Sequence, residues 1–148
     1  MTLTNETILV IDYGSQYTQL IARKIREQQI FCLVYPFNKI NRKILEDKTL
    51  SGIILSGGPN SVKDKSSPKL NKNILDLNIP VLGICYGLQL LSKEFNGKIV
   101  KSRSREYGHS IITIKNKSLL FDKVKKRNQV WMSHGDHIEK APDNFVIT

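Results

Sequence analysis

Four short apolar runs, each ended by a turn signal, constrain the fold of this chain more than any other feature. They occupy residues 7–12, 30–36, 51–56 and 79–84. Helix-type patterns lie between them; after the first run, for example, Leu20, Ile21 and Ile25 fall on one helical face. Strands that are apolar throughout and separated by helices are typical of a parallel sheet covered on both faces. We therefore predict an α/β fold with an open, mostly parallel sheet and helices on both faces.

The predicted helices lie in the connections between these runs. Ser15 precedes the first helix and is placed to act as its N-cap. The helices are expected at residues 16–28, 41–47, 69–77 and 86–95. After Gly97 the pattern changes to strand-like runs with little helix between them, at residues 98–104, 109–115 and 129–134. We expect these runs to add later antiparallel strands to the fold.

Composition indicates a globular chain of 148 residues, with 40% hydrophobic and 24% charged residues. No apolar run reaches the ~20 residues that a membrane span requires, and the N-terminus does not resemble a signal peptide. We expect one domain over residues 1–148, a cytoplasmic location and no membrane partner. The two cysteines, Cys32 and Cys85, do not make a disulfide framework and are expected to be free thiols.

The formal net charge of +10 raises the question of nucleic-acid binding. The lysines are scattered along the chain, and only residues 123–127 form a basic cluster. Aromatic residues suited to base stacking are not interleaved with that cluster. We therefore predict a solvated basic surface and no nucleic-acid partner.

Ligands of open parallel sheets bind outside the carboxyl ends of the strands, so chemistry is expected at the strand exits. The fourth exit, with the sequence GICYG, fits the nucleophile-elbow pattern with cysteine as the nucleophile. Gly83 and Gly87 remove side chains that would collide with neighbouring backbone in such a turn. Cys85 directly precedes a helix, whose positive end favours the reactive thiolate. We predict that Cys85 is a nucleophile and that Cys32, inside a strand, is a buried structural residue.

The third exit, LSGGPNS, carries two glycines before a proline. Such a loop can leave amide groups free to form an oxyanion hole. A phosphate-binding loop is an alternative, but the G-x-x-x-x-G-K-[ST] pattern is absent. A simple turn is the other alternative.

A further candidate exit, VWMSHGD, contains His134. This histidine could act as a general base for Cys85, or its loop could present backbone groups to a ligand. His109 and His137 are interpreted as surface or packing histidines. The sequence shows no cluster with metal-ligand spacing, so no metal site is predicted.

Together these motifs resemble the class I glutamine amidotransferases. Residues 8–27, 104–108 and 130–136 resemble, within that family, the glutaminase domains of glutamine-hydrolysing GMP synthases. The resemblance extends over essentially the whole chain. It implies a flavodoxin-like sheet, glutamine as substrate and no cofactor for the glutaminase reaction itself.

The resemblance also implies roles for individual residues. Cys85 would form a glutamyl thioester, with the backbone amides of Gly58 and Tyr86 as the oxyanion hole. Gln89 would help to hold the substrate; without the resemblance it would be interpreted as a solvent-facing helix residue. The loop formed by Ser133, His134, Gly135 and Asp136 would bind the amino and carboxylate ends of glutamine. Asp136 would otherwise be interpreted as a turn residue.

The family takes its general base from a His-Pro-Glu motif on a later strand, and these 148 residues do not contain that motif. The ATP-pyrophosphatase domain, which would use ATP and Mg²⁺, and the dimerisation domain of a homodimeric enzyme are also absent. The expectation is therefore an incomplete amidotransferase domain with little activity alone. Alternatives are the glutaminase of another synthase, such as anthranilate or carbamoyl phosphate synthase, a flavodoxin-like nucleotide- or flavin-binding module, and an inactive regulatory protein.

Overall fold

The computed structural model describes residues 6–116 and 118–148, without the side chains of residues 102–107, 133 and 134. The chain forms two compact units, one ending at Leu91 and the other running from Ser92 to Thr148. The prediction of a single amidotransferase domain over residues 1–148 stays a prediction.

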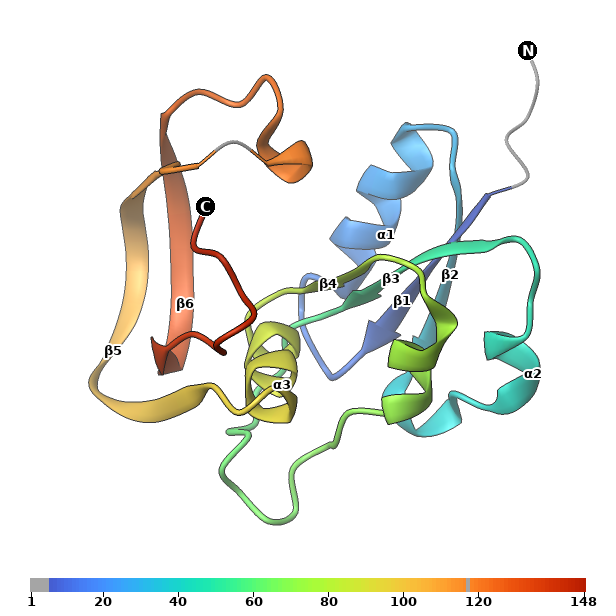
Figure 1. The fold of residues 1–148 in the computed structure, drawn as a ribbon, viewed down its shortest axis with the longest axis horizontal. Coiled ribbons are helices and arrows are strands. Elements are labelled where there is room, and N and C mark those ends of the chain that lie inside the picture. The colour runs from blue at the N-terminus through green and yellow to red at the C-terminus, as the bar shows by residue number, and fades with distance from the viewer. Residues whose placement is uncertain (1–5, 117) are drawn as a thin grey trace. The chain divides into compact units, whose positions relative to one another are not determined.

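The first unit is built on a four-stranded parallel sheet with strand order β2-β1-β3-β4. Its strands are β1 (Thr7–Asp12), β2 (Phe31–Pro36), β3 (Leu50–Leu55) and β4 (Val81–Gly83). The connections contain α1 (Thr18–Glu27), η1 (Phe37–Lys39), α2 (Arg42–Leu45) and η2 (Lys72–Leu77), and α3 (Tyr86–Glu94) follows β4. Figure 1 shows α1 on one side of this sheet and η2 on the other.

Alternation along the strands explains why both faces of the sheet are covered. Val10 points to the α1 face, where it forms a buried cluster with Ala22 and Cys32. Leu9 and Ile11 point to the opposite face and are also fully buried. The prediction of an open parallel sheet covered by helices on both faces is confirmed, as is the structural interpretation of Cys32.

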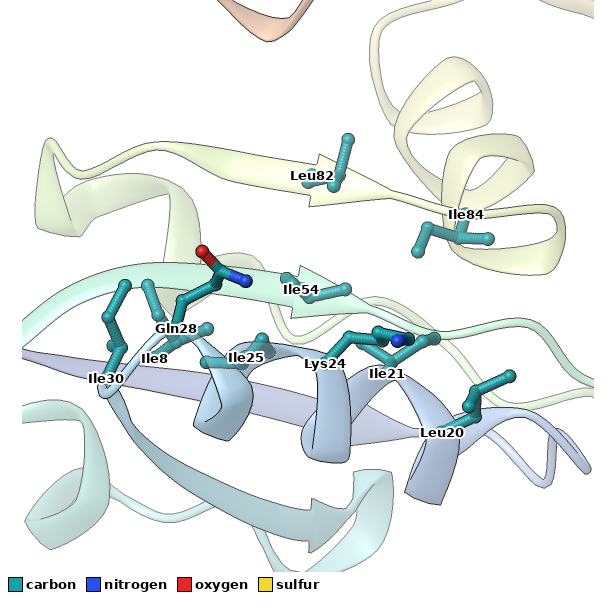
Figure 2. Close-up of a pocket in the computed structure, with 10 residues that line it drawn as sticks. All are labelled: Ile8, Leu20, Ile21, Lys24, Ile25, Gln28, Ile30, Ile54, Leu82 and Ile84. Atoms are coloured by element: carbon teal, nitrogen blue, oxygen red, sulfur yellow. The ribbon is translucent and has the colours of Figure 1, made fainter.

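An apolar groove of about 570 Å³ lies on the α1 face, beside the part of the sheet that α1 leaves open. Its lining residues are Ile8, Leu20, Ile21, Lys24, Ile25, Gln28, Ile30, Ile54, Leu82 and Ile84. Figure 2 shows the α1 side chains on one side of the groove and Leu82 and Ile84 on the other. Lys24 and Gln28 are the two polar side chains among these lining residues, so the groove offers little for binding a phosphate or a sugar.

The start of α1 differs from the prediction. Tyr17, not Ser15, occupies the N-cap position, and the Ser15 hydroxyl accepts a hydrogen bond from the Tyr17 amide at 3.0 Å. The Asp12 carboxylate accepts from the Gly14 amide and from the Thr18 hydroxyl, each at 2.8 Å. Because Asp12 organises the turn after β1, the helix begins two residues later than the sequence suggested.

Residues 69–77 also differ from the prediction, because only Lys72–Leu77 are helical and they form a 3₁₀ helix. Asn71 accepts a hydrogen bond from the Asn73 amide at the start of this element. Asn78 adopts a left-handed conformation, with a φ of 51°, at its end. Because Asn71 and Asn78 end the helix within six residues, the segment forms only a short 3₁₀ helix.

The second unit contains a two-stranded antiparallel sheet formed by β5 (Lys98–Thr113) and β6 (Arg127–Lys140). A short 3₁₀ helix, η3 (Leu119–Phe121), lies in the connection between them. The prediction of later antiparallel strands is confirmed, although residues 98–104 and 109–113 belong to one long strand rather than two, and residues 114 and 115 lie beyond its end. Within residues 6–116 and 118–148, we find no helix with the length and apolar character needed to span a bilayer.

Candidate active site

Cys85 lies in the sharp turn between the end of β4 at Gly83 and the start of α3 at Tyr86. Its φ is 51°, in the left-handed region that a residue with a side chain rarely adopts. The Cys85 carbonyl accepts a hydrogen bond from the Gln89 amide at 3.0 Å, so the turn leads directly into the helix. The structure therefore has the strand-turn-helix geometry that the elbow pattern predicted.

The two glycines of the elbow have no room for a side chain. A Cβ atom built on Gly83 would lie 2.6 Å from the backbone nitrogen of Leu88. A Cβ atom built on Gly87 would lie 2.3 Å from the carbonyl oxygen of Leu55. Both distances are far below van der Waals contact, so the collisions inferred from the pattern are confirmed for this turn.

The glycine loop after β3 lies against Cys85. A Cβ atom on Gly57 would contact the Cβ of Cys85 at 3.5 Å, and one on Gly58 would lie 2.6 Å from the carbonyl oxygen of Tyr13. Within the described part of the chain, the amides of Gly58 and Tyr86 donate no hydrogen bond to another backbone group. The Tyr86 amide is instead directed at the Cys85 sulfur. An amide donor beside a thiol, next to a glycine loop, can stabilise the oxyanion that forms when the thiol attacks an amide.

The ionisation of Cys85 runs against the expectation from its position at a helix start. Burial raises the pKa of the Cys85 thiol, and the hydrogen bond from the Tyr86 amide offsets only part of this rise. The direction is upward because burial removes water that would solvate a thiolate. The thiol therefore needs a proton acceptor to become nucleophilic near neutral pH.

An aromatic cluster supports the residues around Cys85. The ring of Tyr13 stacks on Phe37, with centroids 5.7 Å apart, and is tilted against Tyr86 at 5.5 Å. Burial raises the pKa of Tyr13 well above its usual range. The Tyr86 hydroxyl donates to the carbonyl of Pro68 at 2.5 Å. Sequence reasoning missed Tyr13, whose only signal was its position directly after the first strand.

Gln89 lies one helical turn after Cys85, and its side chain is buried. The interpretation of Gln89 as a solvent-facing helix residue is therefore wrong. Cys85, Gly58, Tyr86 and Gln89, all predicted to belong to the site, lie together in the first unit.

The strand predicted at residues 129–134 is confirmed, but the loop predicted at residues 133–136 is wrong, because residues 130–136 all belong to one strand. They lie inside β6, where Asp136 pairs with Lys101 and His134 with Glu106 of β5. Asp136 is buried in this strand and is not a turn residue. The backbone of residues 102–105 stands opposite Gly135 alone, so the strand pairing is irregular here and the extra residues belong to β5. The side chains of Ser133 and His134 lie outside the described residues.

The other two histidines lie on the surface of the second unit. His109 meets Trp131 edge to face at 4.8 Å and shares a hydrogen bond with Gln129 at 2.8 Å. His137 is exposed. Among the described residues, no group of three His, Cys, Asp or Glu side chains could hold a metal ion. Cys32 and Cys85 are both free thiols, as predicted.

Comparison with known families decides the relationship of this chain. The family model described as glutamine amidotransferase class-I matches residues 9–148. The chain belongs to the class-I glutamine amidotransferase family.

Among curated relatives of this amidotransferase chain, the GMP synthase [glutamine-hydrolyzing] of Clostridium botulinum is 45% identical over 145 residues, which are 98% of this chain. The corresponding enzyme of Natranaerobius thermophilus is 44% identical over 146 residues. The amidotransferase chain spans 28% of the length of each of these relatives.

A solved structure agrees with the family assignment. A candidate GMP synthase subunit from Thermoplasma acidophilum matches with a TM-score of 0.74 and 28% identity. The match covers 95% of the amidotransferase chain and 70% of the Thermoplasma chain. It therefore includes both the parallel sheet of the first unit and the antiparallel strands of the second.

Proposed function

We propose that this chain is the glutamine-hydrolysing part of a GMP synthase, with Cys85 as the nucleophile. The observation that carries the proposal is the position of Cys85 in a strained elbow, with the Tyr86 amide hydrogen-bonded to its thiol and Gly57 of the glycine loop next to its Cβ. The identity of 41–45% to GMP synthases favours this function over the glutaminase of another synthase. The apolar lining of the groove beside α1 gives no support to a nucleotide- or flavin-binding module.

The proposed reaction begins with attack of the Cys85 sulfur on the side-chain amide carbon of glutamine. The amide carbonyl oxygen becomes an oxyanion, which the amides of Gly58 and Tyr86 stabilise. Ammonia leaves when the tetrahedral intermediate collapses, and a glutamyl thioester remains on Cys85. Water then hydrolyses the thioester to glutamate and regenerates the thiol.

The proton of the thiol must pass to a general base and then to the departing amine. The raised pKa of Cys85 makes this base necessary for turnover near neutral pH. In the family the base belongs to a His-Pro-Glu motif, which residues 1–148 do not contain. Gln89 and, in the second unit, Ser133, His134, Gly135 and Asp136 are proposed to hold the amino-acid part of the substrate.

The ammonia is proposed to be consumed by a synthetase part that uses ATP and Mg²⁺ to aminate xanthosine monophosphate to GMP. The curated relatives, described as glutamine-hydrolysing GMP synthases, support such a partner, since this chain matches only a fraction of their length. A homodimer of the whole enzyme belongs to the same proposal.

An analogue of L-glutamine in which a chloromethyl ketone replaces the side-chain amide tests the proposed nucleophile. The thiolate sulfur adds to its carbonyl carbon and forms an oxyanion. The sulfur then bonds to the chloromethyl carbon as chloride leaves, its bond to the carbonyl carbon breaks, the carbonyl re-forms, and a stable thioether remains. We expect saturable labelling of Cys85, measured by peptide mass spectrometry, and protection by L-glutamine but not by D-glutamine. Cys32→Ala is the matched control and should label like the parent chain. Labelling that does not saturate and that glutamine does not slow would overturn the proposal.

A further inference from the structure

Ser56 connects three strand exits through all of its polar groups. It is fully buried and directly follows β3. Its amide donates to the carbonyl of Ile11 at 3.0 Å, and its carbonyl accepts from the amide of Gly87 at 3.1 Å. Its hydroxyl accepts from the amide of Tyr13 at 3.1 Å and donates to the carbonyl of Gly57 at 2.9 Å. One residue therefore ties the exit of β1, the glycine loop after β3 and the elbow after β4 to one another.

We propose that Ser56 is a positioning residue, which sets the spacing between the two amide donors around Cys85. This inference rests on the proposed function, because it takes Gly58 and Tyr86 as the donors. Gly57, held by the Ser56 hydroxyl, directly precedes Gly58. Gly87, whose amide donates to the Ser56 carbonyl and also to the carbonyl of Ile84 at 3.0 Å, directly follows Tyr86. Both donors are thus one residue away from a hydrogen bond to the same buried serine.

Tyr13 is a second link between Ser56 and the two proposed donors. Its amide is held by the Ser56 hydroxyl, and its carbonyl oxygen is the atom against which the backbone of Gly58 is pressed. Its ring meets the ring of Tyr86. A shift of Tyr13 would therefore move both donors, so the Ser56 hydroxyl acts on each of them by two routes.

The buried position needs a small side chain whose hydroxyl can both accept and donate a hydrogen bond, and serine provides this. Alanine would leave the Tyr13 amide without its acceptor and the Gly57 carbonyl without its donor, in a site that water does not reach. The loop would then relax to satisfy these groups, and the donors would move relative to Cys85. A displacement of about 1 Å in such a site can cost about 100-fold in rate.

The experiment compares two reagents at Cys85 in the full 148-residue chain. The glutamine-shaped chloroketone reacts through an oxyanion, whereas iodoacetamide alkylates the thiol by direct displacement and needs no oxyanion hole. The ratio of the two rates at Cys85 therefore reports the oxyanion hole and is insensitive to thiol exposure. We expect Ser56→Ala to lower this ratio by about 10- to 100-fold, with the iodoacetamide rate within about twofold of the parent chain.

Two variants separate positioning from a general loss of stability. Ser51→Ala removes a hydroxyl at the other end of β3, where it donates to the carbonyl of Thr7 at 3.3 Å, and should leave the ratio unchanged. Ser56→Thr keeps the hydroxyl, so its ratio of chloroketone to iodoacetamide rates should stay close to that of the parent chain. Amide hydrogen exchange of the parent chain gives a measurement that needs no variant, since the amides of Tyr13 and Gly87 should exchange slowly.

The outcomes distinguish this inference from the proposed function. If the parent chain shows no glutamine-protected labelling, the proposed function is wrong and the inference falls with it. If the parent chain labels as expected but Ser56→Ala keeps the ratio, the inference alone is overturned. Exchange of the Tyr13 and Gly87 amides at the rate of exposed loop amides would also overturn it, whether or not Ser56→Ala folds.

Discussion

The backbone of Gly87 packs directly on the carbonyl of Leu55, so closely that a Cβ atom on Gly87 would lie 2.3 Å from the Leu55 oxygen. The first turn of α3 is thereby seated on the end of β3, and the elbow that holds Cys85 is fixed between a strand and a helix. This contact joins the geometry of the proposed nucleophile to the core of the sheet, since Leu55 is fully buried.

Gly87→Ala should therefore destabilise the chain severely. Alanine is the better helix former by about 1 kcal/mol, but the clash is with backbone that cannot move without disturbing β3. We expect a loss of about 3 kcal/mol or more in the free energy of unfolding, measured by urea denaturation. Gly57→Ala is the control, because its Cβ would have ordinary contacts at 3.5 Å, and it should cost much less. Equal losses for the two variants would contradict the packing described for Gly87.

Cys85→Gly should stabilise the chain. A residue with a side chain at a φ of 51° carries local strain of about 1–2 kcal/mol, which glycine relieves. Glycine also gains entropy in the unfolded state, so we expect a net gain of about 1 kcal/mol or less. Urea denaturation measures it. Gln29→Gly, at an exposed position with a φ of 62°, should give a similar gain without changing the labelling of Cys85.

Cys85→Ala should separate the two halves of the proposed reaction. In the proposed enzyme, which would join this chain to a synthetase part, glutamine-dependent GMP formation should be lost, whereas synthesis from added ammonia should persist, because the proposed nucleophile serves only to release ammonia. Cys32→Ala should lower stability by about 1–2 kcal/mol, as a small core deletion does, and leave both activities intact. Glutamine-dependent turnover in the Cys85→Ala protein would remove the central assignment.

The pH dependence of Cys85 alkylation should reflect its burial. Because the pKa of the folded thiol is raised, the reactive thiolate is scarcer near pH 7 than in an ordinary cysteine. We expect the iodoacetamide rate at Cys85 to rise with pH with a midpoint above that of free cysteine, about 8.5. In denaturing urea the midpoint should return to the ordinary value. A midpoint below that value in the folded chain would mean that the helix start outweighs burial.

The basic surface should bind nucleic acid weakly, if at all. The lysines and arginines are spread over the chain, and the cluster at residues 123–127 is exposed and contains no aromatic residue. Any DNA or RNA binding should be independent of sequence and should disappear by about 0.2 M salt, because it would rest on phosphate contacts alone. Fluorescence anisotropy with labelled oligonucleotides measures this. Binding that persists at that salt concentration would show that the charge marks a nucleic-acid site.

The sequence by itself determined the features that arise from local order. The alternation of apolar runs and helical patterns predicted the parallel sheet, and the spacing of Gly83, Cys85 and Gly87 predicted the elbow. Both signals are short-range, because periodicity and glycine spacing act within one or two turns of the chain. The same short range explains the error at residues 133–136, where a serine and a glycine suggested a loop but pairing with β5 keeps the strand continuous.

Only the tertiary structure decided how the elbow is supported and how its thiol ionises. Ser56 and Tyr13 are 43 positions apart in sequence, and they meet because β1 and β3 are neighbours in the sheet. No local pattern marks either residue as part of the site. The pKa of Cys85 likewise depends on burial in the folded chain, which raises it more than the hydrogen bond from the Tyr86 amide lowers it. Strand pairing and burial are properties of the folded chain. They decide which residues support the elbow and how the Cys85 thiol ionises, and a local sequence motif does not contain this information.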